Sequence, residues 1–129
     1  MVETGRDLFE SIAEKMKLSA DEKRAAAELI LLNPDLLLAQ YKNGKELSPE
    51  AERYEKEGNP LVAENRFATA LKLALYEGKL DLAKKYLKKC VTLNQTNNSA
   101  YNIASSHFDS VSRVVMEFYK AKSAGASNQ

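Results

Sequence analysis

The sequence predicts an all-α protein, an array or bundle of about seven helices that contains one well-defined helical hairpin. Three observations lead to this fold class. Apolar residues recur at spacings of three and four, as on one face of a helix. No segment alternates polar and apolar residues for long, as a half-buried strand would. Single glycines, and prolines preceded by Ser or Asn, interrupt the chain at intervals typical of helix lengths.

Start and stop residues place the helices in turn. Ser19 and Glu22 form a capping-box pattern ahead of an apolar run. Three further starts put a capping side chain before a proline, at Asn33-Pro34, Ser48-Pro49 and Asn59-Pro60. A glycine stands where each of three helices should end, at Gly44, Gly58 and Gly78. The expected helices are residues 5–17, 20–32, 34–43, 49–57, 60–77, 80–93 and 99–121.

The 129 residues are enough for one domain to bury a core without disulfide or metal staples. We expect residues 1–122 to form a single helical domain and residues 123–129, which have little to bury, to form a flexible tail. The single cysteine, Cys90, excludes an internal disulfide framework and a multi-cysteine zinc site. The acidic start does not resemble a secretory signal, and no apolar run is long enough to span a membrane. A cytoplasmic protein is therefore expected.

The second and third expected helices are apolar most of the way round. They carry Leu29–Leu32 and Leu36–Ala39, whereas an amphipathic surface helix needs only one apolar stripe. Either these helices run through the middle of the domain, or one side of them forms a homodimer interface. We prefer the first interpretation.

The last expected helix has a regular apolar stripe at spacings of three and four. Its members are Tyr101, Ala104, Phe108, Val111, Val115 and Phe118. The stripe spans too few heptads for a coiled coil. We expect one long helix that packs along the others.

Residues 60–94 form the clearest unit, a helical hairpin with its elbow at Gly78 in the stretch "EGKLDLA". Its packed side carries Phe67, Leu71 and Ala74 on the first helix, then Leu80, Ala83, Leu87 and Cys90 on the second. In this pattern the hairpin resembles a tetratricopeptide repeat. Small side chains in such a repeat let two antiparallel helices approach, and the glycine permits the tight reversal.

The resemblance implies that the first helix of the hairpin lines a concave groove that receives peptides. Asn65, Thr69, Lys72 and Tyr76 follow one another at spacings of four, three and four, so they form a narrow polar stripe on an otherwise buried helix. Amide, hydroxyl and ammonium groups there can hold the main chain or a carboxylate of an extended peptide, with Tyr76 as a flat contact. The alternative is a stripe that is only solvated.

Charge is distributed unevenly along the chain. Residues 1–58 hold nine Lys and Arg and thirteen Asp and Glu, whereas residues 59–129 hold ten and five. Five lysines on and before the helix at 80–93 make up a basic face: Lys79, Lys84, Lys85, Lys88 and Lys89. This basic face can meet an acidic protein surface or nucleic acid, or it can be only solvated. The two halves can also face each other within the fold.

No catalytic or metal-binding constellation stands out. His107 is the only histidine, Cys90 is expected on the packed side of its helix, and the glycines do not form a phosphate-binding loop. We therefore expect a non-enzymatic protein without cofactor, metal or membrane partner. The preferred function is an adaptor or scaffold that binds a peptide or an acidic protein surface. The alternatives are a nucleic-acid-associated helical protein that uses the basic face and a dimeric structural subunit.

Overall fold

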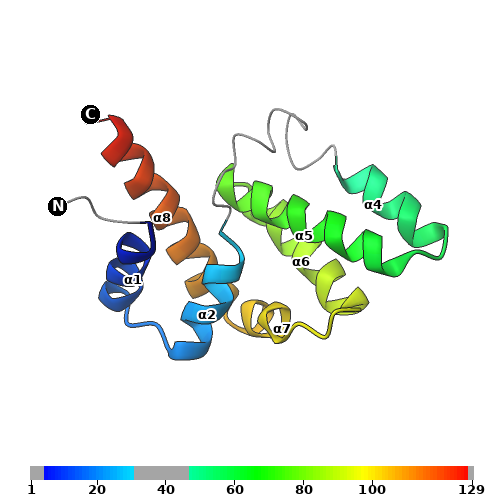
Figure 1. Cartoon of the computed structure of the whole chain (residues 1–129), viewed down its shortest axis with the longest axis horizontal. Helices are drawn as coiled ribbons and strands as arrows, with labels where there is room; N and C mark the ends of the chain where they lie inside the picture. The colour runs from blue at the N-terminus through cyan, green and yellow to red at the C-terminus, as the bar shows by residue number, and fades with distance from the viewer. Residues whose placement is uncertain (1–4, 31–46, 128–129) are drawn as a thin grey trace.

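A computed structural model describes residues 5–30 and 47–127, with side chains for residues 7–30 and 47–122. Within these ranges the chain forms seven α-helices and no strand, which confirms the all-α fold class (Figure 1). The helices are α1 (Gly5–Lys15), α2 (Ala20–Glu28), α4 (Leu47–Lys56), α5 (Pro60–Tyr76), α6 (Leu80–Leu93), α7 (Ser99–Ser106) and α8 (Phe108–Ser127). In this part of the chain, no helix has both the length and the apolar character that crossing a bilayer requires.

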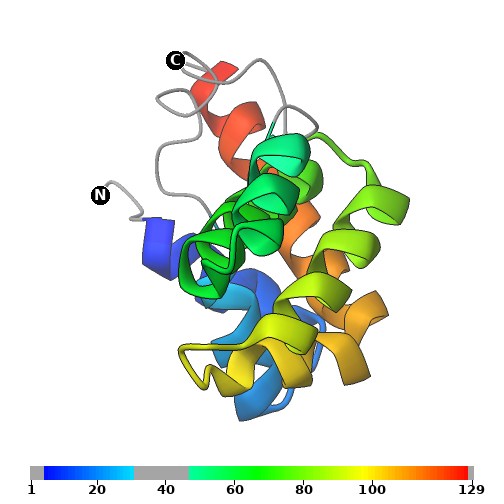
Figure 2. The same cartoon turned by 90° about the vertical axis from the view of Figure 1, so that its right-hand side faces the viewer.

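The helices form two packed groups. In the first group α4, α5 and α6 lie side by side, and α5 in the middle packs against both neighbours (Figure 1). In the second group α8 packs against α1 and α2, and α7 packs against α2. The groups share a border, because α7 also contacts α6 and α8 also contacts α5 (Figure 2).

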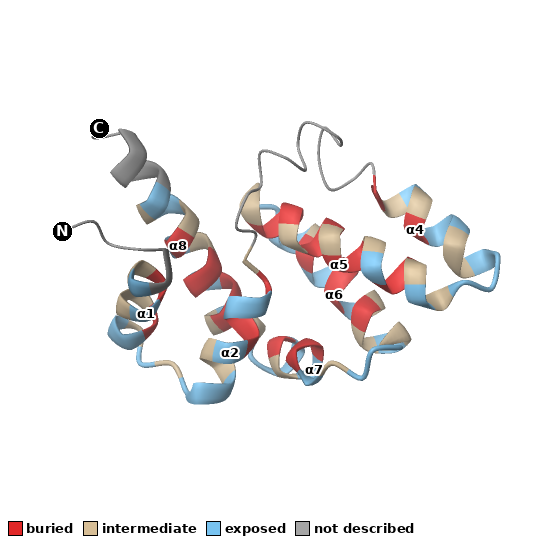
Figure 3. Cartoon of the chain, in the orientation of Figure 1, coloured by how far each residue is buried: buried red, intermediate tan, exposed pale blue. Residues whose placement is uncertain are grey.

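One continuous hydrophobic core joins the two groups. Its large, fully buried side chains include Phe67 and Leu71 of α5 and Tyr86 of α6. Phe9 of α1 meets Phe118 of α8 edge to face, with ring centroids 6.2 Å apart. Figure 3 shows the buried positions concentrated on α5, α6 and α8. Each large apolar side chain buried in this way stabilises the fold by roughly 1.5–3 kcal/mol.

The leucine-rich second helix runs into this core. α2 ends at Glu28 instead of near residue 32, and the next residue, Leu29, is buried. Ile30 also packs against the core cluster. These two contacts agree with the preferred interpretation that the helix runs through the domain. Residues 31–46, which hold the rest of the leucine-rich sequence and the expected helix at 34–43, lie outside the described residues, so the homodimer interface stays a prediction.

Three helices end in the same backbone motif. At the end of α5, Gly78 has φ +75°, and the N–H of Lys79 donates to the C=O of Ala74 at 2.8 Å. This Schellman motif pairs carbonyl groups that a helix end would otherwise leave free. Gly58 closes α4 and Lys17 closes α1 in the same way, at φ +78° and +58°. The elbow at Gly78 therefore lies where the sequence predicts it, between the antiparallel helices α5 and α6.

The prediction of one long helix over residues 99–121 is wrong. α7 ends at Ser106 and α8 begins at Phe108, with His107 between them at φ −124° and ψ 41°. Ser105, Ser106 and His107 are weak helix formers, so a break there costs little. It redirects the chain so that α7 packs on α6 while α8 packs on α1. α8 then runs on to Ser127, past the expected end at residue 121.

The apolar stripe predicted for these residues survives the break. Its buried members are Tyr101, Ala104, Val111, Val115 and Phe118, and Phe108 is half-buried. Both helices therefore turn the predicted side toward the core, although they point in different directions.

A hydrogen-bonded carboxylate ties the start of α2 to α8. The N–H of Glu22 donates to the Ser19 hydroxyl at 3.1 Å, and the N–H of Ser19 donates to the Glu22 carboxylate at 3.2 Å, which confirms the capping box. The Ser110 hydroxyl donates to the same carboxylate. The bond from Ser110, followed by those from Ser19, lowers the pKa of Glu22 because each favours the charged form.

Two ion pairs join the acidic first half of the chain to the basic second half. Glu50 of α4 pairs with Arg66 of α5 at 3.4 Å, and Glu55 of α4 pairs with Lys89 of α6 at 3.1 Å. Each such partly exposed pair contributes at most about 1 kcal/mol. Part of the uneven charge is thus neutralised inside the fold.

Replacing Gly78 by Ala should lower the free energy of unfolding by about 1 kcal/mol, because a side chain disfavours the left-handed conformation. A Cβ at this position would meet only the methyl carbon of Met116, at 3.9 Å, so the effect is conformational and not steric. Lys17→Gly should raise stability by about 0.5–1 kcal/mol, since Lys17 holds the same conformation without being glycine. Urea unfolding followed by circular dichroism measures both. Unchanged midpoints in both variants would contradict this account of the helix ends.

Candidate functional site

One side of α5 remains open after the helix has packed against its neighbours. Nine of its 17 residues are buried. Along the open side runs a hollow of about 640 Å³ with α5 as one wall and the α6–α7 loop and the start of α7 as the other. The lining residues are Leu61, Val62, Glu64, Asn65, Arg66, Ala68, Thr69, Lys72, Thr96, Asn98 and Tyr101.

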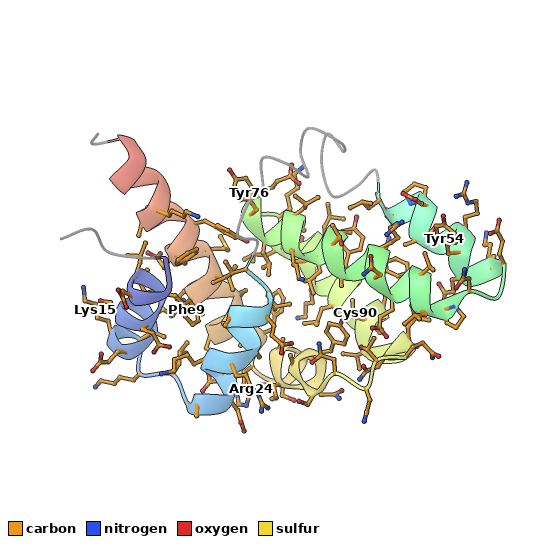
Figure 4. The ribbon with its side chains drawn as sticks, in the orientation of Figure 1. Phe9, Lys15, Arg24, Tyr54, Tyr76 and Cys90 are labelled. Carbon is orange, nitrogen blue, oxygen red and sulfur yellow. The ribbon has the colours of Figure 1, made fainter. Side chains whose placement is uncertain are left out.

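Three of the four residues in the predicted polar stripe line this hollow. Asn65 is exposed, and Thr69 and Lys72 are half-buried. Tyr76 lies at the far end of α5, where its ring meets Tyr119 of α8 edge to face with centroids 5.0 Å apart (Figure 4). It borders a second hollow, of about 510 Å³, formed by the end of α5 and α8. The structure therefore brings Asn65, Thr69 and Lys72 together and leaves Tyr76 apart.

Contacts with neighbouring residues determine which hydrogen bonds the polar stripe can still make with a ligand. Arg66 donates to the side-chain oxygen of Asn65 at 3.0 Å, so the amide NH₂ of Asn65 remains as a pair of donors. The hydroxyl of Thr69 donates to the backbone C=O of Asn65 at 3.1 Å, which leaves its oxygen as an acceptor. The open side of α5 thus offers donors at Asn65 and an acceptor at Thr69.

The two cations on the hollow differ in their partners. Arg66 is paired with Glu50 at 3.4 Å. Lys72 has no ion pair or hydrogen bond with any residue that the structure describes. At the opposite end of the hollow, Leu61 is 55% exposed, one of two large apolar side chains that the described part of the chain leaves exposed. The hollow therefore has a cationic end and an apolar end.

The second wall of the hollow is held by Glu64, a carboxylate of α5 that is only 2% exposed. Glu64 accepts hydrogen bonds from the N–H of Gln95, from the N–H of Thr96 at 3.3 Å and from the hydroxyl of Thr96 at 2.7 Å. These donors replace the water that a buried charge loses. Glu64 thereby fixes the α6–α7 loop against α5.

The loop itself is shaped by asparagines. Asn94 and Asn97 take positive φ values of 23° and 52°, a region that asparagine enters more readily than most residues. The N–H of Asn98 donates to the side chain of Asn94 at 2.7 Å. The side chain of Asn98 in turn accepts from the N–H of Ala100 at 2.9 Å and so caps α7. The chain therefore enters α7 in one defined direction, beside the hollow.

Two buried titratable groups lie close to the hollow. Burial raises the pKa of Tyr101 above its ordinary value and raises the pKa of Cys90 to about 12. The Cys90 thiol is therefore protonated near neutral pH, and it is fully buried within the core (Figure 4). This confirms the expectation that Cys90 is a small core residue. His107 is exposed at the α7–α8 junction, and no group of three His, Cys, Asp or Glu in the described ranges could hold a metal ion.

Three lysines of the predicted basic face have a partner within the chain. Lys79 pairs with Glu77 at 3.7 Å, and Lys89 pairs with Glu55 at 3.1 Å. Lys84 lies over the ring of Phe108, 5.8 Å from its centroid. The other two, Lys85 and Lys88, are exposed and have no such contact with the residues described here. The structure thus places all five lysines on or before α6, but only two of them are uncommitted.

Sequence reasoning predicts Lys72 at the cationic end of the hollow but not its second wall or its apolar end. Thr96, Asn98 and Tyr101 reach the hollow only through the fold, and no signal in the sequence marks Leu61 as exposed. For Glu64 a signal existed. It stands three residues before Phe67 and continues the apolar spacing of α5, and a charged residue on a buried face requires a partner.

Comparison of the chain with protein-family models, with curated proteins and with solved structures gives no match.

Glu64→Ala should lower the free energy of unfolding by about 2–3 kcal/mol, because it removes the three hydrogen bonds that join α5 to the exposed loop residues Gln95 and Thr96. Thr96→Val removes the hydroxyl donor alone and should cost about 1 kcal/mol. Urea unfolding gives both values, and Glu14→Ala, at an exposed position on α1, is the matched control. If Glu64→Ala behaved like the control, the carboxylate would not hold the loop.

The Cys90 thiol should not react with a thiol-specific chromogenic reagent at pH 8 while the protein is folded, because its pKa of about 12 and its burial suppress the thiolate. In denaturing urea the same thiol should react fully and rapidly. The absorbance change over time measures both rates. Rapid reaction in the folded state would show that α5 and α6 do not cover Cys90.

Proposed function

We propose that this protein is a non-enzymatic interaction module, an adaptor or scaffold that binds an extended acidic peptide in the hollow along α5. The observation that carries the proposal is the row of polar groups with spare hydrogen-bonding capacity on the open side of α5, which ends at Lys72, a cation with no ion pair or hydrogen bond among the described residues. The hollow, at about 640 Å³, lies within the range of typical ligand sites.

The polar groups in the middle of the hollow suit a peptide main chain. An extended peptide presents both N–H and C=O groups that need partners. Asn65 supplies donors for a C=O group and Thr69 supplies an acceptor for an N–H group. A ligand with only one kind of group would leave part of this row unused.

Charge favours an acidic peptide. Lys72 is half-buried, so its attraction for a carboxylate is less screened by water and salt than at an open surface. Hydrogen bonds from neutral donors do not neutralise the Glu64 carboxylate, but this side chain is only 2% exposed and lies against the α6–α7 loop. Among the described residues that line the hollow, Lys72 is the charged side chain without an ion pair or hydrogen bond, and its charge is positive.

The resemblance of residues 60–94 to a tetratricopeptide repeat supports the same location. In that family the first helix of the hairpin lines the peptide groove, and here that helix is α5. The basic face is a weaker candidate because three of its five lysines already have partners in the chain.

Lys72→Glu should abolish the binding of acidic peptides selected from a random displayed library against the native protein. The substitution replaces attraction with repulsion, and a loss of at least about tenfold in affinity is expected. Fluorescence anisotropy with the selected peptides measures the affinity. Lys85→Glu on the exposed face of α6 is the matched control and should bind normally.

Stability should be unchanged in the Lys72→Glu variant, since Lys72 has no partner among the described residues, and thermal unfolding checks this. A library that yields no binder at all, or binders that ignore the charge at position 72, would refute the proposed function.

A further inference from the structure

We propose that the hollow recognises the spacing between two side chains of its peptide. An apolar side chain would rest on Leu61 and an acidic side chain would pair with Lys72, and the two would lie four residues apart in the peptide. This inference rests on the proposed function and adds to it the chemical pattern of the ligand.

Leu61 supplies the apolar anchor. At 55% exposure it is one of two large hydrophobic side chains that the described part of the chain leaves exposed, and it borders the hollow together with the half-buried Val62. Single exposed apolar side chains are common on protein surfaces, so what makes Leu61 a candidate anchor is its position on the same hollow as Lys72. An apolar side chain of the peptide would remove this surface from water.

Lys72 stands on the same side of α5 as Leu61. The two residues are eleven positions apart, which is close to three helical turns, so their side chains leave the helix in nearly the same direction. At 1.5 Å per residue their Cα atoms are about 16 Å apart. Asn65 and Thr69 lie between them along the same side.

An extended peptide can meet both anchors only at certain spacings. Its side chains alternate between two faces, so residues that both point at α5 are an even number apart. At about 3.3 Å per residue, four residues cover about 13 Å and six cover about 20 Å. Side chains on a helix lean toward its N-terminus. The side chain of Lys72 therefore leans toward Leu61, and the side chain of Leu61 leans away from Lys72. The lysine side chain is the longer of the two, so its displacement is the larger. The anchors are therefore closer than their Cα atoms, which favours a spacing of four.

The same geometry requires only one acidic residue. The other cation on the hollow, Arg66, is already neutralised by Glu50 at 3.4 Å. The residues between the anchors would present their main chain to Asn65 and Thr69, so their side chains are free to vary. The pattern is therefore an apolar residue, three unrestricted residues and an acidic residue, in either chain direction.

A series of labelled peptides tests the spacing. Each peptide consists of Ser and Thr with one Leu and one Glu. Its ends are acetylated and amidated, so that the Glu side chain is its only acid. The Leu and the Glu stand two to seven positions apart, with either residue nearer the N-terminus. Affinity is measured by fluorescence anisotropy with the full chain. Spacing four should bind about tenfold more tightly than three or five.

Paired variants separate the two anchors. Leu61→Ser should erase the preference for Leu over Ser in the peptide and keep the preference for Glu over Gln, and Lys72→Gln should do the reverse. Leu80→Ser and Lys85→Gln are the matched controls and should retain both preferences. Lys85 is exposed on α6, and Leu80, which the sequence places on the packed side of the hairpin, is instead 41% exposed. Thermal unfolding confirms that each variant is folded.

The outcomes distinguish the two proposals. Affinity that is independent of spacing, or binding of library-selected peptides with no binding of this series, would overturn the spacing rule and leave the peptide-binding function in place. Failure of both the series and the library would overturn both.

Discussion

The buried carboxylate of Glu64 is the interaction on which the arrangement of the site depends. It lies on α5, and its three hydrogen-bond donors lie on the α6–α7 loop some thirty residues later. Because a buried charge without donors is very unfavourable, the loop has essentially one position in which the fold is stable. That position sets the direction in which α7 leaves the loop and so the second wall of the hollow. A charged residue on the buried side of an apolar helix thus positions the second wall of the hollow.

Local signals in the sequence predict the helices of this fold well, but they predict poorly how the helices pack against one another. The capping box at Ser19 and the left-handed glycine at Gly78 depend on a few adjacent residues, and both are where the sequence places them. The break at His107 is different, because it depends on what α7 and α8 pack against and not on a breaker residue. Tyr76 follows the same rule: it shares the helical face of Lys72, but α8 covers its end of the helix. The sequence pattern predicts which residues share a helical face, whereas the packing of the helices determines which parts of that face are covered.

Under the proposed function, the two sides of α5 would serve stability and recognition separately. Its buried side carries Phe67, Leu71 and the other core residues that hold α4 and α6 in place. Its open side carries an exposed leucine, an amide and a hydroxyl with spare hydrogen-bonding capacity, and an ammonium that has no partner among the described residues. Groups on the open side add little to folding, so they can change without disturbing the scaffold. A rigid helix with an independent surface is a suitable base for a site whose ligand preference must be adjusted in small steps.

The contact between Phe9 of α1 and Phe118 of α8 has a consequence for how the chain is made. These residues are separated by most of the sequence, and α2 likewise packs on α7 and α8. At typical rates of synthesis, about 5–20 residues per second, α1 emerges from the ribosome roughly 5–20 s before α8. During that interval the apolar sides of α1 and α2 have no partner, whereas the hairpin of α5 and α6 can form as soon as it emerges. We therefore expect the α5–α6 hairpin to form first, and α1 and α2 to complete their packing only after α8 has emerged.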